Sequence, residues 1–272
     1  MTCMEEYFRH LEEEAKKCYE IARAARSRGD DPEIDVEIPM AEDLASRVEK
    51  LIGIEGIAGI IRDYSRIYDR ETVSIMAARE IARRLSDDRN RAIDIAVRVG
   101  LAILTEGILV APLEGITDVK IKNNRDGSEY LSIYYSGPIR GGGGTAQALS
   151  VLIGDIVRRD LGIGAFKPSP EVVERYKEEI QIYGNVEHLQ YQPSPQEIEE
   201  TIKNCPVCID GEGTLEHEVS GFRDLPEIET NRVRGGMCLV VAEGIIQKSR
   251  KLKGIVEKMG IEGWGFLDKL IK

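Results

Sequence analysis

A segment that is apolar on most sides of a helix sets the strongest limit on how this chain can fold. Between residues 93 and 104, helical spacing places six apolar positions on one face: Ile93, Ala96, Val97, Gly100, Leu101 and Leu104. The opposite side is apolar as well, through Ile95, Val99 and Ile103. A helix that is apolar on most sides is buried on most sides. We therefore expect this segment at the centre of a helical domain.

Helical patterns also flank this central segment on both sides. Before it, the spacing predicts helices near 42–52, 55–68 and 71–85, and after it near 145–160, 170–182, 195–203 and 236–258. Two of the later helices have typical starts, Ser169-Pro170 and Ser194-Pro195-Gln196-Glu197, and the second is a capping box with proline at the first helical position.

The period of the pattern changes from helix to strand between about 117 and 135. Val119 and Ile121 alternate with lysines, and Tyr130–Tyr135 is rich in aromatic and β-branched residues. Asp126-Gly127 between them is a turn dipeptide, so an antiparallel hairpin is expected. The predicted fold class is mainly α with a small antiparallel β-hairpin or sheet (α+β). A chain of 272 residues is long enough for one or two such domains.

The N-terminal thirty residues carry a narrow apolar stripe of the kind that pairs two helices. Alternating spacings of four and three place these residues on one seam of a helix over residues 1–30: Met4, Phe8, Leu11, Ala15, Cys18, Ala22 and Ala25. Residues 31–40 are predicted to be a linker, and residues 41–272 the helical domain. The seam either packs within the same domain or mediates oligomerisation or another contact outside it, and both alternatives remain open.

Composition excludes several classes of protein. No apolar run approaches the ~20 residues of a membrane-spanning helix, and the acidic N-terminus is not that of a signal peptide, so we expect a cytoplasmic protein without a membrane partner. Five cysteines are an odd number, which favours reduced thiols. A net charge of -11 excludes a uniformly basic surface, so any DNA binding would depend on local basic patches.

The run from Gly137 to Thr145 is the first candidate patch. Four consecutive glycines before a helix expose backbone N–H groups that favour an anion, and an arginine beside them adds a bidentate donor for phosphate. The candidate DNA-binding residues here are Arg140, Gly141, Gly142, Gly143 and Thr145. The alternative is a turn in which two backbones pack closely. There is no Walker motif, and the loose dinucleotide fingerprint follows a hairpin strand, which makes it a weak signal.

A second Arg-Gly-Gly sequence precedes another apolar helix. The two copies are interpreted as the same kind of phosphate-binding arrangement. Residues 232–258 hold seven basic and two acidic side chains, and the candidate phosphate contacts are Arg232, Arg234, Gly235, Lys248, Arg250, Lys251 and Lys253. Favourable placement of cations at a helix C-terminus is the alternative for the 248–253 cluster. Residues 197–229 hold ten acidic and two basic side chains, as is typical of a solvated face.

Cys205-Pro-Val-Cys208 has the spacing of half a zinc ribbon, but structural zinc needs four ligands. His188, His217 and Cys238 do not complete the set at a recognisable spacing, so Cys205 and Cys208 are a weak metal candidate and a β-turn is favoured. The carboxylates show no pairing typical of a two-metal centre. No catalytic residue is predicted.

Three segments together resemble a known family. Tyr130-Leu-Ser-Ile-Tyr-Tyr-Ser-Gly-Pro-Ile-Arg-Gly, Asn204-Cys-Pro-Val-Cys-Ile-Asp-Gly-Glu and Thr230-Asn-Arg-Val-Arg-Gly-Gly-Met-Cys-Leu-Val are similar to the N-terminal region of the large subunit of archaeal D-family DNA polymerase. The resemblance covers essentially the whole chain. It implies a replicative DNA-directed polymerase, with its catalytic carboxylates beyond residue 272 and a 3'-5' exonuclease in the small subunit.

The residues and the resemblance combine in one expectation: an accessory domain that holds DNA by its phosphates and helps to assemble the polymerase. Expected partners are DNA, the small exonuclease subunit, the remainder of the large subunit and a second copy bound through the N-terminal helix. We expect no cofactor in this segment and a divalent metal, Mg²⁺, in the full polymerase. The alternatives are a scaffold that contacts only protein and, less favoured, a free nucleotide-binding enzyme.

Overall fold

The computed structural model describes residues 3–29, 41–106 and 111–271, and the chain divides into two units, Met1–Met40 and Ala41–Lys272. The first unit contains helix α1 (Cys3–Ser27). Its seam is exposed at Met4, Phe8 and Leu11, whose side chains are 66%, 57% and 45% accessible. The predicted linker 31–40 lies outside the described residues.

The second unit begins with four helices, the last of which contains the predicted central segment: α2 (Leu44–Ile52), α3 (Ile57–Ser65), α4 (Arg70–Arg84) and α5 (Arg89–Leu104). Aspartates cap three of them, because Asp43, Asp69 and Asp88 each accept a hydrogen bond from a backbone N–H in the first turn. Helix α5 packs against α2, α4 and α7 (Gly143–Asp160). Both faces are buried as predicted, with Val97 on one and Val99 on the other at 0% exposure, while Ile95 and Leu104 are partly buried.

The sheet confirms the predicted fold class and adds a strand. Strands β1 (Ile116–Asn123) and β2 (Glu129–Tyr135) form the antiparallel hairpin, which follows the short helix α6 (Ala111–Glu114). Strand β3 (Cys208–Gly211) then pairs parallel with β2, giving the order β1-β2-β3. The sheet is therefore mixed rather than purely antiparallel, because β3 returns to β2 through a long helical connection.

Helix α7 lies on the sheet and is buried around most of its circumference. The close approach depends on Gly154, where a β-carbon would lie 2.7 Å from Cδ1 of Ile133 on β2. A short 3₁₀-helix, η1 (Gly137–Gly142), connects β2 directly to α7. The predicted glycine-rich turn is thus a helical turn, and α7 begins at Gly143 rather than near residue 145.

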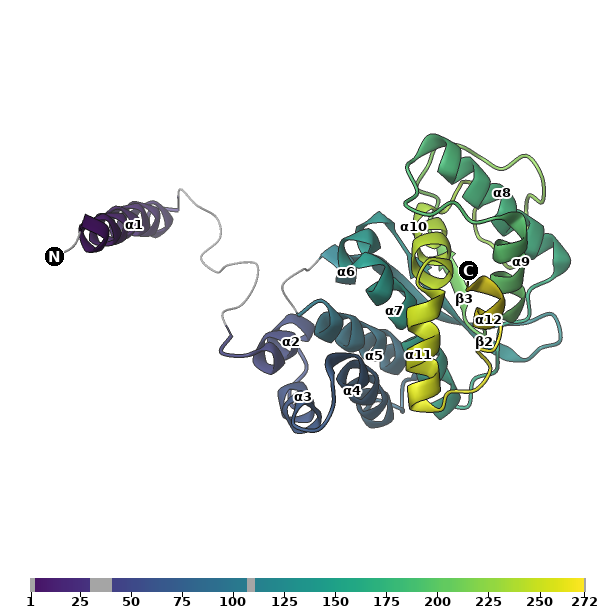
Figure 1. The fold of residues 1–272 in the computed structure, drawn as a ribbon, viewed down its shortest axis with the longest axis horizontal. Coiled ribbons are helices and arrows are strands. Elements are labelled where there is room, and N and C mark those ends of the chain that lie inside the picture. The colour runs from purple at the N-terminus through teal and green to yellow at the C-terminus, as the bar shows by residue number, and fades with distance from the viewer. Residues whose placement is uncertain (1–2, 30–40, 107–110, 272) are drawn as a thin grey trace. The chain divides into compact units, whose positions relative to one another are not determined.

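The remaining helices close the unit: α8 (Pro170–Val186), α9 (Pro195–Asn204), α10 (Gly235–Leu239), α11 (Ser249–Met259) and α12 (Leu267–Leu270). The capping box predicted at Ser194 is present at the start of α9. The single helix predicted over 236–258 is instead divided by a π-helical segment, η2 (Val240–Ile246). Figure 1 shows α11 beside α7, with α8 and α9 at the end of the unit away from α2 and α3.

Candidate nucleic-acid interface

The glycine turn precedes the N-terminus of α7, which has no side-chain cap among the described residues. Gly141 and Gly143 are exposed, and Gly143 has φ +76°, a left-handed conformation that favours glycine. The first N–H groups of an α-helix lack intrahelical partners and carry the positive end of its dipole. The Gly143 N–H donates to the Arg140 carbonyl of the preceding 3₁₀-helix, so an anion at this 18-residue helix would use the later N–H groups of its first turn.

Two lysines of the predicted cluster adjoin this turn. Thr145, Lys248 and Lys251 line one small hollow between α7 and α11. The approach at Gly144 is tight, because a β-carbon there would lie 2.3 Å from the Glu243 carbonyl oxygen and 2.8 Å from Cε of Lys248. Gly143 therefore meets a backbone requirement, and Gly144 supports the close-packing interpretation of the glycine run. Anion binding at this turn stays a prediction.

Arg140 contributes to the fold as well as to the surface. Its Nη2 donates to Oε1 of Glu243 at 2.8 Å and to the carbonyl of His188 at 2.9 Å. The side chain remains 35% exposed. A phosphate contact would use this exposed part, and the contact stays a prediction.

Arg234 does not lie on the surface, and its predicted phosphate contact is wrong for that reason. Its side chain is 0% exposed, and its guanidinium donates from Nη1 to Asp210 at 2.7 Å and from Nη2 to Glu179 at 2.8 Å. The same group lies 4.6 Å from the centre of the Tyr176 ring. Glu179 also accepts from Nε of Arg175 at 2.7 Å. Arg234 therefore links α8, β3 and α10 inside the core.

The glycines after Arg234 are also needed for packing in the core. The two Arg-Gly-Gly sequences therefore do not form the same kind of phosphate-binding arrangement. A β-carbon at Gly236 would lie 2.2 Å from the carbonyl carbon of Tyr135, and one at Gly235 would lie 2.6 Å from Oγ1 of Thr214. Both glycines are buried. Gly235 has no exposed backbone to offer a phosphate, and here the close-packing alternative holds.

The other predicted cations are more exposed, but several of them form ion pairs. Lys251 pairs with Glu71 at 3.2 Å, and Lys253 pairs with Asp268 on α12. Arg232 and Arg250 are exposed. The structure thus brings Thr145, Lys248 and Lys251 together with the glycine turn, while ion pairs to α4 and α12 offset part of the positive charge of α11.

Cys205 and Cys208 lie in the hydrophobic core, 2% and 3% exposed. Burial raises the pKa of Cys205 to about 12 and that of Cys208 to about 11, which disfavours the thiolate that a metal requires. Among the described residues, no group of three or more His, Cys, Asp or Glu is placed to hold a metal ion. Cys205 is the C-cap of α9 and Cys208 begins β3, with a bend at residues 206–207 between them.

Sequence reasoning missed Glu243, which organises one side of the site. It is 2% exposed on η2, and its Oε1 accepts from both Arg140 Nη2 and the backbone N–H of Gln190, each at 2.8 Å. The signal was present, because Glu243 is the one charged residue in the apolar stretch 235–246. A lone carboxylate in such a stretch is buried with a partner.

Comparison with known proteins places nearly the whole chain in one family. Residues 6–272 match the family described as "DNA polymerase II large subunit DP2, N-terminal". The chain belongs to this polymerase large-subunit family. The resemblance seen in the three sequence segments is thereby confirmed. In the part of the chain that the structure describes, no helix meets the length and apolarity that crossing a membrane requires.

Relatives named "DNA polymerase II large subunit" cover nearly the whole chain. The Thermoplasma acidophilum protein is 55% identical over 267 residues, the Picrophilus torridus protein 57% over 267 and the Pyrococcus abyssi protein 51% over 275. These alignments include 98%, 98% and 99% of this chain but 25%, 25% and 19% of the respective relatives. The chain therefore spans a quarter or less of the length of these relatives.

Proposed function

We propose that this chain is the N-terminal accessory part of a replicative DNA polymerase large subunit and that it holds DNA by its phosphates. The supporting observation is the N-terminus of α7, which has no side-chain cap in the described chain and lies beside Lys248 and Lys251, with Gly141 and Gly143 of the preceding turn exposed. Backbone N–H groups and lysines bind phosphate without reading sequence. In this proposal the polymerase centre and its Mg²⁺ belong to the rest of the large subunit, and 3'-5' exonuclease activity belongs to the small subunit.

Salt-dependent DNA affinity tests this role. We expect Lys248→Ala/Lys251→Ala to bind a fluorescent primer–template duplex more weakly, and to lower the slope of log affinity against log salt by about 1 to 2, since each lost phosphate contact removes ~0.9. Arg232→Ala tests the exposed arginine separately. The control is Lys203→Ala/Lys269→Ala, which removes two exposed, ion-paired lysines elsewhere. Equal affinity and slope in test and control variants would remove this surface from the interface.

A second role, assembly through α1, is favoured by the exposed seam. Apolar side chains at heptad spacing are buried when a second helix packs against them, which stabilises both helices. Met4, Phe8 and Leu11 are all exposed. We propose that this seam mediates self-association or binding to another polymerase subunit.

Deletion of residues 1–30 separates the two roles. We expect the deletion to lower the mass measured by light scattering, or to abolish binding of the small subunit, while DNA affinity stays unchanged. A substitution control, Glu12→Gln/Glu13→Gln on the polar side of α1, should leave both properties intact. No change of mass or subunit binding after the deletion would contradict the role of the seam.

A further inference from the structure

The apolar seam of α1 changes in size along the helix. It runs from three large side chains to four small ones: Met4, Phe8 and Leu11, then Ala15, Cys18, Ala22 and Ala25. The axes of two packed helices lie about 8 to 10 Å apart, and the distance is set by the size of the side chains between them. A partner that fits the whole seam must therefore be small where α1 is large and large where α1 is small.

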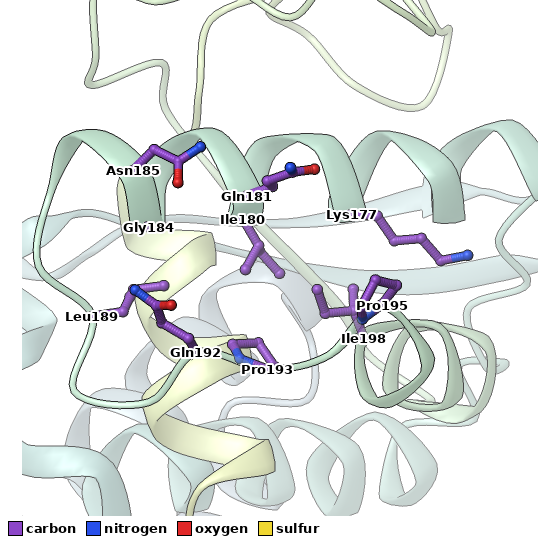
Figure 2. Close-up of a pocket in the computed structure, with 10 residues that line it drawn as sticks. All are labelled: Lys177, Ile180, Gln181, Gly184, Asn185, Leu189, Gln192, Pro193, Pro195 and Ile198. Atoms are coloured by element: carbon purple, nitrogen blue, oxygen red, sulfur yellow. The ribbon is translucent and has the colours of Figure 1, made fainter.

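A pocket in the second unit is too small to receive this seam. The pocket lies between α8, α9 and their connecting loop, has a volume of about 270 Å³ and is lined in part by Ile180, Leu189 and Ile198 (Figure 2). Such a volume holds about one or two side chains, whereas the seam extends over about 32 Å of helix. The seam therefore needs a partner of its own length, and a second helix has that shape.

A second copy of α1 in antiparallel orientation has the complementary profile. The register that overlaps the two helices along nearly their whole length sets Phe8 opposite Ala25 of the second copy, and Leu11 opposite Ala22 of the second copy. Large residues then face small ones, and the two axes keep one spacing. A parallel pair would set Phe8 against Phe8, so the large half of the seam would hold the small half apart.

The positions that flank the seam carry charges that match in the antiparallel pair. In this register Glu5 faces Arg26 of the second copy, and the two-fold symmetry forms this contact twice. Tyr7 faces Arg28 of the second copy on the other flank, where a guanidinium can lie over the ring. A parallel pair would set Arg26 beside Ile21 instead and would bring no opposite charges together at the flanking positions.

The same pattern selects one register among the antiparallel ones. A shift of one heptad in one direction would set Glu14 against Glu14 of the second copy, where like charges repel. A shift of one heptad in the other direction would set Phe8 opposite residue 32, beyond the end of α1 at Ser27. The register with Phe8 on Ala25 has neither defect.

We propose that α1 pairs with α1 of a second copy of this chain in antiparallel orientation. Phe8 and Leu11 of each helix pack on Ala25 and Ala22 of the other, and an ion pair between Glu5 and Arg26 forms at both ends. The inference rests on the proposed assembly role of the seam and adds to it the partner, the direction and the register. The C-terminal ends of the two helices then lie at opposite ends of the pair.

Engineered disulfides test the direction. One form of the 272-residue chain carries Leu11→Cys and another carries Ala22→Cys, both in a Cys3→Ser/Cys18→Ser background, and the two are mixed in a glutathione redox buffer. The other three cysteines are buried. We expect at least about tenfold more mixed disulfide than either same-form disulfide, because identical positions lie about 16 Å apart in this register. Non-reducing electrophoresis of differently tagged chains measures the products.

Charge reversal tests the register without added cysteines. We expect Glu5→Arg or Arg26→Glu alone to raise the dimer dissociation constant about threefold to tenfold, and the double reversal to restore it to within about twofold. The two positions lie about 32 Å apart in one helix, so only a contact between copies gives this rescue. The matched control, Glu6→Arg/Arg23→Glu, reverses charges on the outward side and should show no rescue. Analytical ultracentrifugation measures association, and circular dichroism measures helix content.

The outcomes separate this inference from the role on which it rests. An excess of same-form disulfides would mean a parallel pair, which overturns the inference while the assembly role stands. A chain that is monomeric alone and gains mass only with the small subunit would likewise reject a second copy as the partner. A double reversal that associates no better than the single ones would reject the register. A monomer that binds no small subunit would contradict both the inference and the assembly role.

Discussion

The two arginines that precede glycine pairs have opposite environments. Arg140 is partly exposed beside the N-terminus of α7, whereas Arg234 is enclosed by Glu179, Asp210 and the Tyr176 ring. A buried guanidinium has lost its hydration, so it is stable only while both carboxylates accept its hydrogen bonds. The short motif Arg-Gly-Gly therefore carries no function by itself.

Replacing Arg234 should affect stability rather than DNA affinity. We expect Arg234→Met to lower the free energy of unfolding by about 3–5 kcal/mol, because Glu179 and Asp210 would remain buried with less compensation. Arg232→Met, on an exposed side chain, should change it by less than about 0.5 kcal/mol. Urea unfolding followed by circular dichroism measures both. Similar values for the two variants would contradict the structural role of Arg234.

At the residue scale, the sequence predicted where helices, caps and turns lie better than it predicted which side chains are buried. The central helix, the capping box at Ser194 and the turn at Asp126-Gly127 depend on local patterns, and the structure contains all three. The burial of Arg234 depends on Glu179 and Asp210, which are 55 and 24 residues away in the chain. Because Arg234 lies in a basic stretch of the sequence, it was predicted to be on the surface.

At the scale of elements, the π-helical segment η2 joins the glycine turn to the loop before α9. Its residue Glu243 accepts from Arg140 on η1 and from the Gln190 N–H of the loop. A π-helix inside a longer helical run commonly occurs at functional positions, and the sequence pattern of 236–258 gave no sign of it. The parallel strand β3 was missed for a related reason, since four residues are too few to show a period.

Neutralising Glu243 should loosen this connection. We expect Glu243→Gln to speed backbone hydrogen exchange at residues 188–192 and to cost about 1–2 kcal/mol of stability, because charge-assisted hydrogen bonds become neutral ones. Glu257→Gln is the control, since Glu257 is exposed on α11 and 3.5 Å from Lys253. Exchange by mass spectrometry measures the effect, and equal protection of the loop in both variants would disprove the link.

At the scale of the whole molecule, paired carboxylates predict a loss of stability in acid. Hydrogen bonds from lysines lower the pKa of Glu199 to about 2, and a hydrogen bond from Lys258 together with the Thr72 N–H lowers that of Asp69 to about 2. The pKa of Glu229 is also about 2, because Tyr134 and Lys120 donate to it. A lowered folded-state pKa contributes stability above the unfolded value, near 4.5 for Glu and 3.8 for Asp.

We therefore expect the thermal midpoint to be constant above about pH 5 and to fall as the pH is lowered toward 2. Glu229→Gln should have a shallower fall than the wild-type protein, because one group that takes up a proton on acid unfolding is gone. Glu216→Gln, an exposed position, serves as the control. Calorimetry across this range measures the slope, and a midpoint independent of pH would refute the expectation.

The tertiary structure also shows how the charges behind the net charge of -11 are distributed. Sequence windows separated a basic segment from an acidic one, but the structure pairs many of those charges across elements, as with Lys251–Glu71 and Lys269–Glu200. Which cations remain for a ligand is a property of tertiary packing and could not be obtained by counting along the chain.

The parallel pairing of β3 with β2 has a consequence for how the protein is made. Residues 116–135 form a local hairpin that can close as soon as it leaves the ribosome, but the edge of β2 stays unpaired until residues 208–211 have been synthesised. During that interval the exposed strand edge can pair with other nascent chains. Non-local pairing is also slow. Residues 208–211 are thus the segment whose late synthesis sets the time during which a growing chain is most vulnerable to aggregation.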